Sequence, residues 1–300
     1  MRQRVSKEQL VHCGRAICIE ELADIRETVA MCSGLSRSEL ALTISEHLEW
    51  RSASGSLKLD ASLKFLEKLE SQGLVKLPEK QAMSGSTRKQ PLLTRRTEAG
   101  EPLEGIVGDL GSVNVVPVTE SDEIGLWNEY MNRYHYLGYK QPFGYFQRYF
   151  ITSERGLLGC LLFSGAAKAL RERDHWIGWS KNERLRNLGF VINNSRFLLF
   201  PWVQVKNLGS HTLGKAVRRL CADWQQRWGY QPVVVETFVD PEHFAGTCYR
   251  AANWLYLGQT TGMGLTRQGK DYTSSLKLIF ALPLVADFRT VLCSSGEVPL

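Results

Sequence analysis

The spacing of apolar residues predicts that the chain begins with three helices. Apolar side chains recur every three or four positions from Ile19 to Met31, which is typical of an amphipathic helix. A Ser-x-x-Glu capping box at Ser36 predicts the start of a second helix, which we expect to run to Leu48. A third helix is expected from Asp60 to Gln72, where Gly73 would end it.

Strand and helix patterns alternate in the rest of the chain. Runs of β-branched and apolar residues predict strands at 113–118, in a hairpin over 149–163, at 196–205, 232–238 and around 256, and at 276–280. Helical patterns lie between them at 122–134, in the segment that ends at Trp228, and at 244–252. The fold class expected from this order is α+β, with a mixed α/β domain at 113–300.

The N-terminal pattern resembles that of a small DNA-binding domain over 1–78. Three helices followed by the basic Leu74-Val-Lys-Leu77 strand have the order of a winged helix-turn-helix, which places its third helix in the major groove. That helix would present Lys58, Lys64 and Lys68 to DNA. Small three-helix units also serve in dimerisation and peptide binding, so that alternative stays open.

Residues 79–112 are expected to form a basic linker. The segment is poor in aromatic residues and rich in small, polar and basic ones. Its cations include Arg88, Lys89, Arg95 and Arg96, which would suit an arm along a phosphate backbone. A linker that is merely soluble is the equal alternative.

Composition limits the classes of function. The 300 residues are 43% hydrophobic and 23% charged, as in soluble globular proteins, and the formal net charge of +6 permits a polyanionic partner. We found no apolar run long enough for a membrane span and no signal-peptide pattern at the start, so a cytoplasmic location is expected. The seven cysteines form no C-x-x-C pair, and no metal site is predicted.

One junction predicts an anion site. A strand leads into Lys206-x-x-Gly209-Ser210-His211 and then a helix, so backbone N–H groups at the helix start could face a phosphate. Glycine before a helix is also ordinary turn chemistry.

Further candidates for chemistry follow in the sequence. Glu236 and Asp240, near the end of a strand, could act as a general base, as metal ligands, or only in salt bridges and caps. Tyr249 on the next short helix is a candidate acid or a core residue. A group rich in Asn and Arg lies near Trp176 and Trp179 in the sequence, and it would suit a phosphate or nucleotide, or a long loop fixed by buried Asn. Its members are Arg184, Arg186, Asn187, Asn193, Asn194 and Arg196.

Several motifs between 134 and 264 resemble a known family. They include Tyr134-His-Tyr-Leu-Gly138, Asn193-Asn-Ser-Arg196-Phe-Leu, Glu236-Thr-Phe-Val-Asp-Pro241 and Gly246-Thr-Cys-Tyr-Arg-Ala-Ala-Asn-Trp254. They are similar to the DruA family of the Druantia anti-phage system, whose relatives occur in insertion-sequence transposases. This resemblance implies a role in phage defence or mobile-element biology.

The element order is also similar to that of the N-acetyltransferase superfamily. That resemblance implies an acetyltransferase-like fold in which the Lys206 to His211 loop binds coenzyme A pyrophosphate and Tyr249 protonates the leaving thiolate. Lys206 and His211 stand where the superfamily has Arg or Gln and a small residue.

Three functions therefore remain in view. The leading hypothesis is a DNA-associated component of a defence system or mobile element, which binds nucleic acid through the winged helix and linker. Defence-system or transposase proteins would be further partners, and no membrane is expected. The alternatives are an acyl- or nucleotidyl-type transferase that uses the Lys206 to His211 loop and Tyr249, and a metal-dependent nuclease that uses Glu236 and Asp240. The cofactor is left unspecified.

Overall fold

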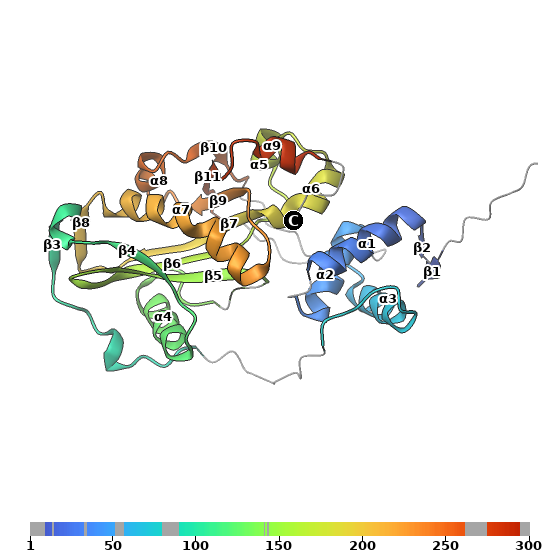
Figure 1. Cartoon of the computed structure of the whole chain (residues 1–300), viewed down its shortest axis with the longest axis horizontal. Coiled ribbons are helices and arrows are strands. Elements are labelled where there is room, and N and C mark those ends of the chain that lie inside the picture. The colour runs from blue at the N-terminus through green and yellow to red at the C-terminus, as the bar shows by residue number, and fades with distance from the viewer. Residues whose placement is uncertain are drawn as a thin grey trace, which may run out of the picture. The chain divides into compact units, whose positions relative to one another are not determined.

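The computed structural model describes residues 10–13, 15–32, 35–51, 57–79, 90–140, 142, 144–261 and 275–294. These residues fall into two compact units, one within 10–79 and the other formed by 90–261 and 275–294 (Figure 1). No helix among these residues is both long enough and apolar enough to cross a membrane.

The N-terminal unit is a small helical domain that begins with a hairpin. Its elements are β1 (Leu10–His12), β2 (Arg15–Ile17), α1 (Ile19–Met31), α2 (Arg37–His47) and α3 (Leu59–Ser71). The three predicted helices are confirmed, and the Ser36 capping box is present at the start of α2. Ile25, Leu40, Ile44 and Phe65 are fully buried between the helices and form the centre of the core.

The basic strand expected after the third helix is absent from the described residues. Residues 74–79 form no strand, and side chains bind two of their backbone groups instead. The N–H of Leu77 donates to Glu70 (3.1 Å), and Arg37 donates to the carbonyl of Pro78 (2.8 Å).

The connection between α2 and α3 also differs from the expected motif. It runs from Leu48 to Lys58, longer than the ~3–4-residue turn of a helix-turn-helix. The helical unit is therefore confirmed, whereas the winged helix-turn-helix remains a prediction.

The C-terminal unit is built on a seven-stranded sheet in the order β10-β11-β9-β7-β6-β5-β4. Its strands are β4 (Asn114–Pro117), β5 (Phe146–Ser153), β6 (Gly156–Gly165), β7 (Val191–Leu199), β9 (Val234–Val239), β10 (Leu255–Gln259) and β11 (Leu278–Pro283). Neighbouring strands of this sheet are antiparallel except for β7 and β9, which are parallel. The predicted hairpin is confirmed as β5 and β6.

Helices cover both faces of the sheet. They are α4 (Ser121–Tyr134), α5 (Arg171–Ile177), α6 (Lys181–Asn187), α7 (Leu208–Trp228), α8 (Thr247–Ala251) and α9 (Phe288–Leu292). Figure 1 shows α7 and α8 on one face and α4 on the other. Trp127 of α4 and Trp224 of α7 are fully buried, so both layers are packed against the sheet. The mixed α+β class is thus confirmed.

Two regions differ from the pattern expected for them. The strand predicted at 196–205 is two strands, because the chain turns at Phe200 to Val203 and β8 (Val203–Lys206) pairs with β3 (Leu103–Ile106) outside the main sheet. Residues 90–112, assigned to the linker, belong to the C-terminal unit: the Thr97 hydroxyl donates to Glu129 of α4 at 2.6 Å.

Candidate functional site

A β-bulge in β7 interrupts the sheet beside its parallel pair. The ladder between β6 and β7 joins Phe163 to Asn194 and Leu162 to Arg196, so Ser195 is an extra residue with no opposite residue in that ladder. A bulge re-aims the side chains that flank it, and here those belong to Asn194 and Arg196. The sequence analysis named both residues as ligand candidates.

Beyond the bulge, β7 and β9 separate. The two strands are paired from Val191 and Val234 only as far as Asn193 and Glu236. In open α/β sheets, ligands bind outside the carboxyl ends of parallel strands where the order of strands changes. The region around the bulge is therefore the part of the sheet in which a ligand site is expected.

Hydrogen bonds from Asn194 and Tyr249 hold the bulge together. The Asn194 amide nitrogen donates to the carbonyls of Leu162 and Arg196, both at 3.1 Å. The Tyr249 hydroxyl donates to Asn194 Oδ1 at 2.7 Å, and Thr237 Oγ1 donates to the Asn194 carbonyl at 2.9 Å. Tyr249 is 7% exposed, and burial raises its pKa, so its proton stays in this network at neutral pH.

The Arg196 guanidinium carries a charge that no acid in the described part of the chain neutralises. It is half-buried, and its hydrogen bond is from Nη1 to the carbonyl of Ser195 at 2.6 Å. Burial lowers the pKa of Arg196, whereas the neighbouring Tyr136 opposes that shift. Removing a cation from water without a paired anion is costly, so this arrangement favours the arrival of an anionic ligand.

His135 lies beside Arg196 and is uncharged at neutral pH. Burial, and then the Arg196 charge, lower its pKa to about 4. Its Nδ1 accepts a hydrogen bond from the N–H of Leu137 at 3.2 Å, so the ring proton is assigned to Nε2. Arg196 is thus the permanent charge of this pair.

Exposed rings lie next to these residues, and we call Tyr136, His243 and Phe244 the aromatic rim. The centroid of Tyr136 is 4.9 Å from His243 and 5.9 Å from Phe244, and its ring also stacks on His135 at 4.9 Å. Tyr136 is 44% exposed and Phe244 is 57% exposed. Sequence reasoning missed the rim, because its members come from loops far apart in the chain.

Asp240 anchors the loop that carries His243 and Phe244. It forms an ion pair with Lys277 at 2.9 Å and accepts a hydrogen bond from the N–H of Glu242 at 3.2 Å. The Lys277 hydrogen bond is the main cause that lowers the pKa of Asp240, so the carboxylate is charged at neutral pH. Its contacts place it as an anchor for the segment that carries His243 and Phe244.

Glu236 forms an ion pair in the protein interior. Its carboxylate lies 3.0 Å from Arg173 Nη1 and accepts the N–H of Ala167 at 2.8 Å, and both charged side chains are 0% exposed. Burial raises the pKa of Glu236, while Arg173 opposes the shift. Glu236 and Asp240 are therefore each bound to a cation, and among the described residues no three His, Cys, Asp or Glu side chains gather as a metal site.

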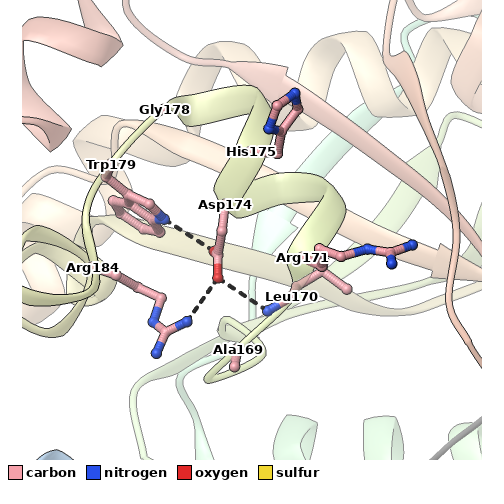
Figure 2. A pocket seen from close by; sticks show the side chains of 8 residues that line it. All are labelled: Ala169, Leu170, Arg171, Asp174, His175, Gly178, Trp179 and Arg184. Carbon is pink, nitrogen blue, oxygen red and sulfur yellow. Dashed lines mark hydrogen bonds and ion pairs between the residues drawn. The ribbon is translucent and has the colours of Figure 1, made fainter.

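A pocket of about 600 Å³ lies at α5 and α6. Figure 2 shows the Asp174 carboxylate among the lining residues, where it accepts hydrogen bonds from Trp179 Nε1 (3.0 Å) and Arg184 Nη1 (2.9 Å). The side chains of Arg171 and His175 point away from this carboxylate. The Asn- and Arg-rich group of the sequence analysis is thus divided: Arg184 joins Trp179 here, and Asn194 and Arg196 lie at the bulge.

The start of α7 keeps the basic character expected of an anion site. Asn207 has a left-handed backbone and gives no side-chain cap, Lys206 is exposed, and Ser210 donates to the Asn207 carbonyl. A Cβ at Gly209 would lie 3.0 Å from Cys248 Cβ, so this glycine allows α7 to approach α8 closely. Burial, and then Lys215 and Arg218, lower the pKa of His211, which keeps it neutral at pH 7.

The predicted DNA-contacting cations lie in different places. Lys64 and Lys68 are exposed one turn apart on α3, and Lys58 is half-buried before its first turn. Arg95 and Arg96 are exposed in a short 3-10 turn of the C-terminal unit. Arg88 and Lys89 lie outside the described residues.

Comparison with known families identifies the chain. The family model described as Druantia protein DruA matches residues 68–276, which is more than half of the chain. The chain belongs to the DruA family. The family resemblance stated from the motifs is confirmed, and the match spans the bulge, Tyr249 and the aromatic rim. None of the curated proteins matches this DruA-family chain.

Several solved acetyltransferases are similar to part of the DruA-family chain. A chimera of spermidine N-acetyltransferase SpeG from Vibrio cholerae and hSSAT is 8% identical, covers 59% of this chain and 98% of its own, and gives a TM-score of 0.38. Aminoglycoside acetyltransferase AAC(6')-Ib with coenzyme A is 16% identical, with 57% and 95% coverage and a TM-score of 0.38. A Bacillus subtilis acetyltransferase with CoA is 9% identical, with 58% and 100% coverage and a TM-score of 0.33. Because their TM-scores are below 0.5, these matches support no inference about activity.

Proposed function

We propose that this DruA-family protein is a nucleic-acid-binding component of an anti-phage defence system or a mobile element. The observation that carries the proposal is the half-buried guanidinium of Arg196, which has no carboxylate partner among the described residues. A backbone phosphate would supply the missing negative charge through charge-assisted hydrogen bonds, for which the planar guanidinium is well suited. The bulge in β7 would then be the rigid support for a phosphate-binding arginine.

A second phosphate contact is proposed on α3 of the N-terminal unit. Lys64 and Lys68 are exposed one turn apart, and we find no carboxylate paired with either of them in the described structure. Exposed lysines of this kind bind phosphates through charge and release counterions, which makes affinity depend on salt. Arg95 and Arg96 would extend the basic surface of the C-terminal unit.

The two enzymatic alternatives have weaker support. The uncapped start of α7 favours an anion, as an acyl- or nucleotidyl-type transferase requires for the phosphates of its donor. However, Tyr249, the acid in that mechanism, already donates its proton to Asn194 and is 7% exposed. In the nuclease alternative, Glu236 and Asp240 are both held by cations, which leaves neither carboxylate free for a metal ion. We therefore favour nucleic-acid binding over the transferase and nuclease alternatives.

The proposal is tested by the affinity of the full chain for labelled DNA across a salt series. We expect Arg196→Gln to weaken binding and to reduce the slope of log K against log salt by ~0.7–0.9, the equivalent of one phosphate contact. The matched control is Arg155→Gln, because Arg155 is an exposed arginine in the turn between β5 and β6.

The stability of the same variant provides an independent check. Since Arg196 is half-buried without an anion, we expect Arg196→Gln to raise the melting temperature of the free protein while it weakens binding. Unchanged affinity and an unchanged salt slope in a folded Arg196→Gln protein would refute the proposed role of this arginine. Affinity independent of salt in the wild-type protein would refute the nucleic-acid proposal as a whole.

A further inference from the structure

We infer that the aromatic rim and Arg196 together recognise unpaired nucleotides of a single-stranded nucleic acid. This inference rests on the proposed function and names the kind of nucleic acid that the bulge site takes. It is carried by three observations: the exposure of the rings, the rigidity of the loops that hold them, and the position of Arg196 beside them.

The rim leaves aromatic surface in water that a soluble protein normally covers. Phe244 is 57% exposed and Tyr136 is 44% exposed, and their ring centroids are 5.9 Å apart. Exposed rings in a group mark a binding surface, whereas single ones are common. Nucleic-acid bases have flat π faces that stack on such rings, and this stacking does not depend strongly on sequence.

The rings are held in place before any ligand arrives. Tyr136 stacks on His135 with planes 25° apart, and the N–H of Gly138 closes the turn onto the His135 carbonyl at 2.7 Å. On the opposite loop, the N–H groups of His243 and Phe244 both donate to the Asp240 carbonyl. A base that stacks on ordered rings loses less conformational freedom than one that must first order a loop.

Arg196 supplies the charge that distinguishes a nucleotide from an apolar partner. The bulge in β7 re-aims Arg196, and its charge acts on both His135 and Tyr136, whose rings stack at 4.9 Å, so the guanidinium lies near the rim. A phosphate on Arg196 and a base on the rim are the two parts of one nucleotide. In a duplex the base faces are already stacked on one another, so only an unpaired strand can use the rings.

The test compares three labelled probes on the full chain: an oligothymidine strand, an abasic strand and a duplex, each about 20 nucleotides long so that they exceed the ~4–16 nucleotides covered by typical single-strand-binding domains. We expect Phe244→Ala to weaken oligothymidine binding about 5- to 150-fold, as expected for loss of stacking with one base. Phe244→Tyr should keep most of the affinity. For the abasic strand, the wild type and Phe244→Ala should bind equally.

Ile106→Ala is the matched control, because Ile106 is also 57% exposed and lies in the same unit. We expect it to leave all three affinities unchanged, and melting temperatures will show whether each variant is folded. If the abasic strand binds as tightly as oligothymidine, or if Phe244→Ala weakens duplex binding to the same extent, the inference is overturned and the proposed function stands. If the wild-type protein binds none of the probes, both are overturned.

Discussion

The ion pair between Arg173 and Glu236 offers a quantitative test of how the C-terminal unit is held together. Both side chains are 0% exposed and lie 3.0 Å apart, and Arg173 also contacts Asp174 at 2.9 Å and the Ala167 carbonyl at 2.8 Å. Removing one partner of a buried pair leaves a charge without compensation and costs ~3–5 kcal/mol. We expect this loss for Arg173→Met.

The other single variant should be milder. In Glu236→Gln, Arg173 keeps its contacts with Asp174 and Ala167, so we expect a smaller loss of ~1–3 kcal/mol for the disrupted hydrogen bonds. The double variant, with methionine at both positions, should recover much of the loss, because an apolar pair can replace a buried ion pair at little cost.

The assay is urea and thermal unfolding of the full chain, and Glu236→Met is measured as well so that the double-mutant cycle with Arg173→Met closes. About 3–5 kcal/mol corresponds to ~6–20 °C in melting temperature for a unit of ~150–250 residues. The pH dependence gives a further check. In the wild type the Arg173 charge opposes the rise in the pKa of Glu236 that burial causes, and Arg173→Met removes this charge. A carboxyl group with a raised folded-state pKa contributes stability at acid pH that is lost as pH rises through that pKa, so the defect should be smaller near pH ~4 than near pH ~8.

Two results would refute this reasoning. Additive losses in the double variant would show that the two side chains are not coupled. A folded Glu236→Gln protein of wild-type stability that lost a metal-dependent cleavage activity would instead make Glu236 catalytic, as in the nuclease alternative.

Two further predictions concern other parts of the chain. Exchange of Lys64 and Lys68 for glutamate should weaken duplex binding and reduce its salt slope by about 2, which a salt series measures; an unchanged slope would remove α3 from the interface. For Glu129, burial alone would raise the pKa, but hydrogen bonds from Thr97 and Thr94 outweigh it and lower the pKa. The contribution of Glu129 to the free energy of unfolding is therefore fully present above the unfolded-state pKa of ~4.3, and it is lost as pH falls through the folded-state pKa. Glu129→Gln should lower stability at neutral pH and make acid unfolding less steep, and parallel acid titrations of the two proteins would contradict that.

Local signals in the sequence were enough for many of the elements. The Ser36 capping box marks the start of α2 because the cap and its Glu39 partner are neighbours in the chain. The hairpin of β5 and β6 follows from two apolar runs around a short turn. In both cases the structure depends on residues that are close in sequence.

Features that depend on distant partners were not predictable in the same way. The segment expected as one strand at 196–205 is divided, because β8 pairs with β3, about a hundred residues earlier in the chain. Likewise, residues 74–79 do not form the expected strand, and Glu70 and Arg37 bind two of their backbone groups instead. Strand pairing and side-chain contacts of this kind leave no periodic pattern.

The candidate site shows the same division. The chemistry of Asn194 and Arg196 was visible in their residue types. That Tyr249 donates a hydrogen bond to Asn194 is known only from the structure. The bulge at Ser195 depends on the register of β6 and had no signal of its own. Tyr136 and Phe244 come from separate loops, so only the fold reveals that they share a surface.

Photo-cross-linking tests most directly the claim that the bulge site binds nucleic acid. A single strand that carries a photoreactive pyrimidine is irradiated with the full chain, and the modified peptides are identified by mass spectrometry. The account predicts adducts on Tyr136 and Phe244 whose yield falls in Arg196→Gln. Adducts confined to α3, or an unchanged pattern in Arg196→Gln, would contradict it.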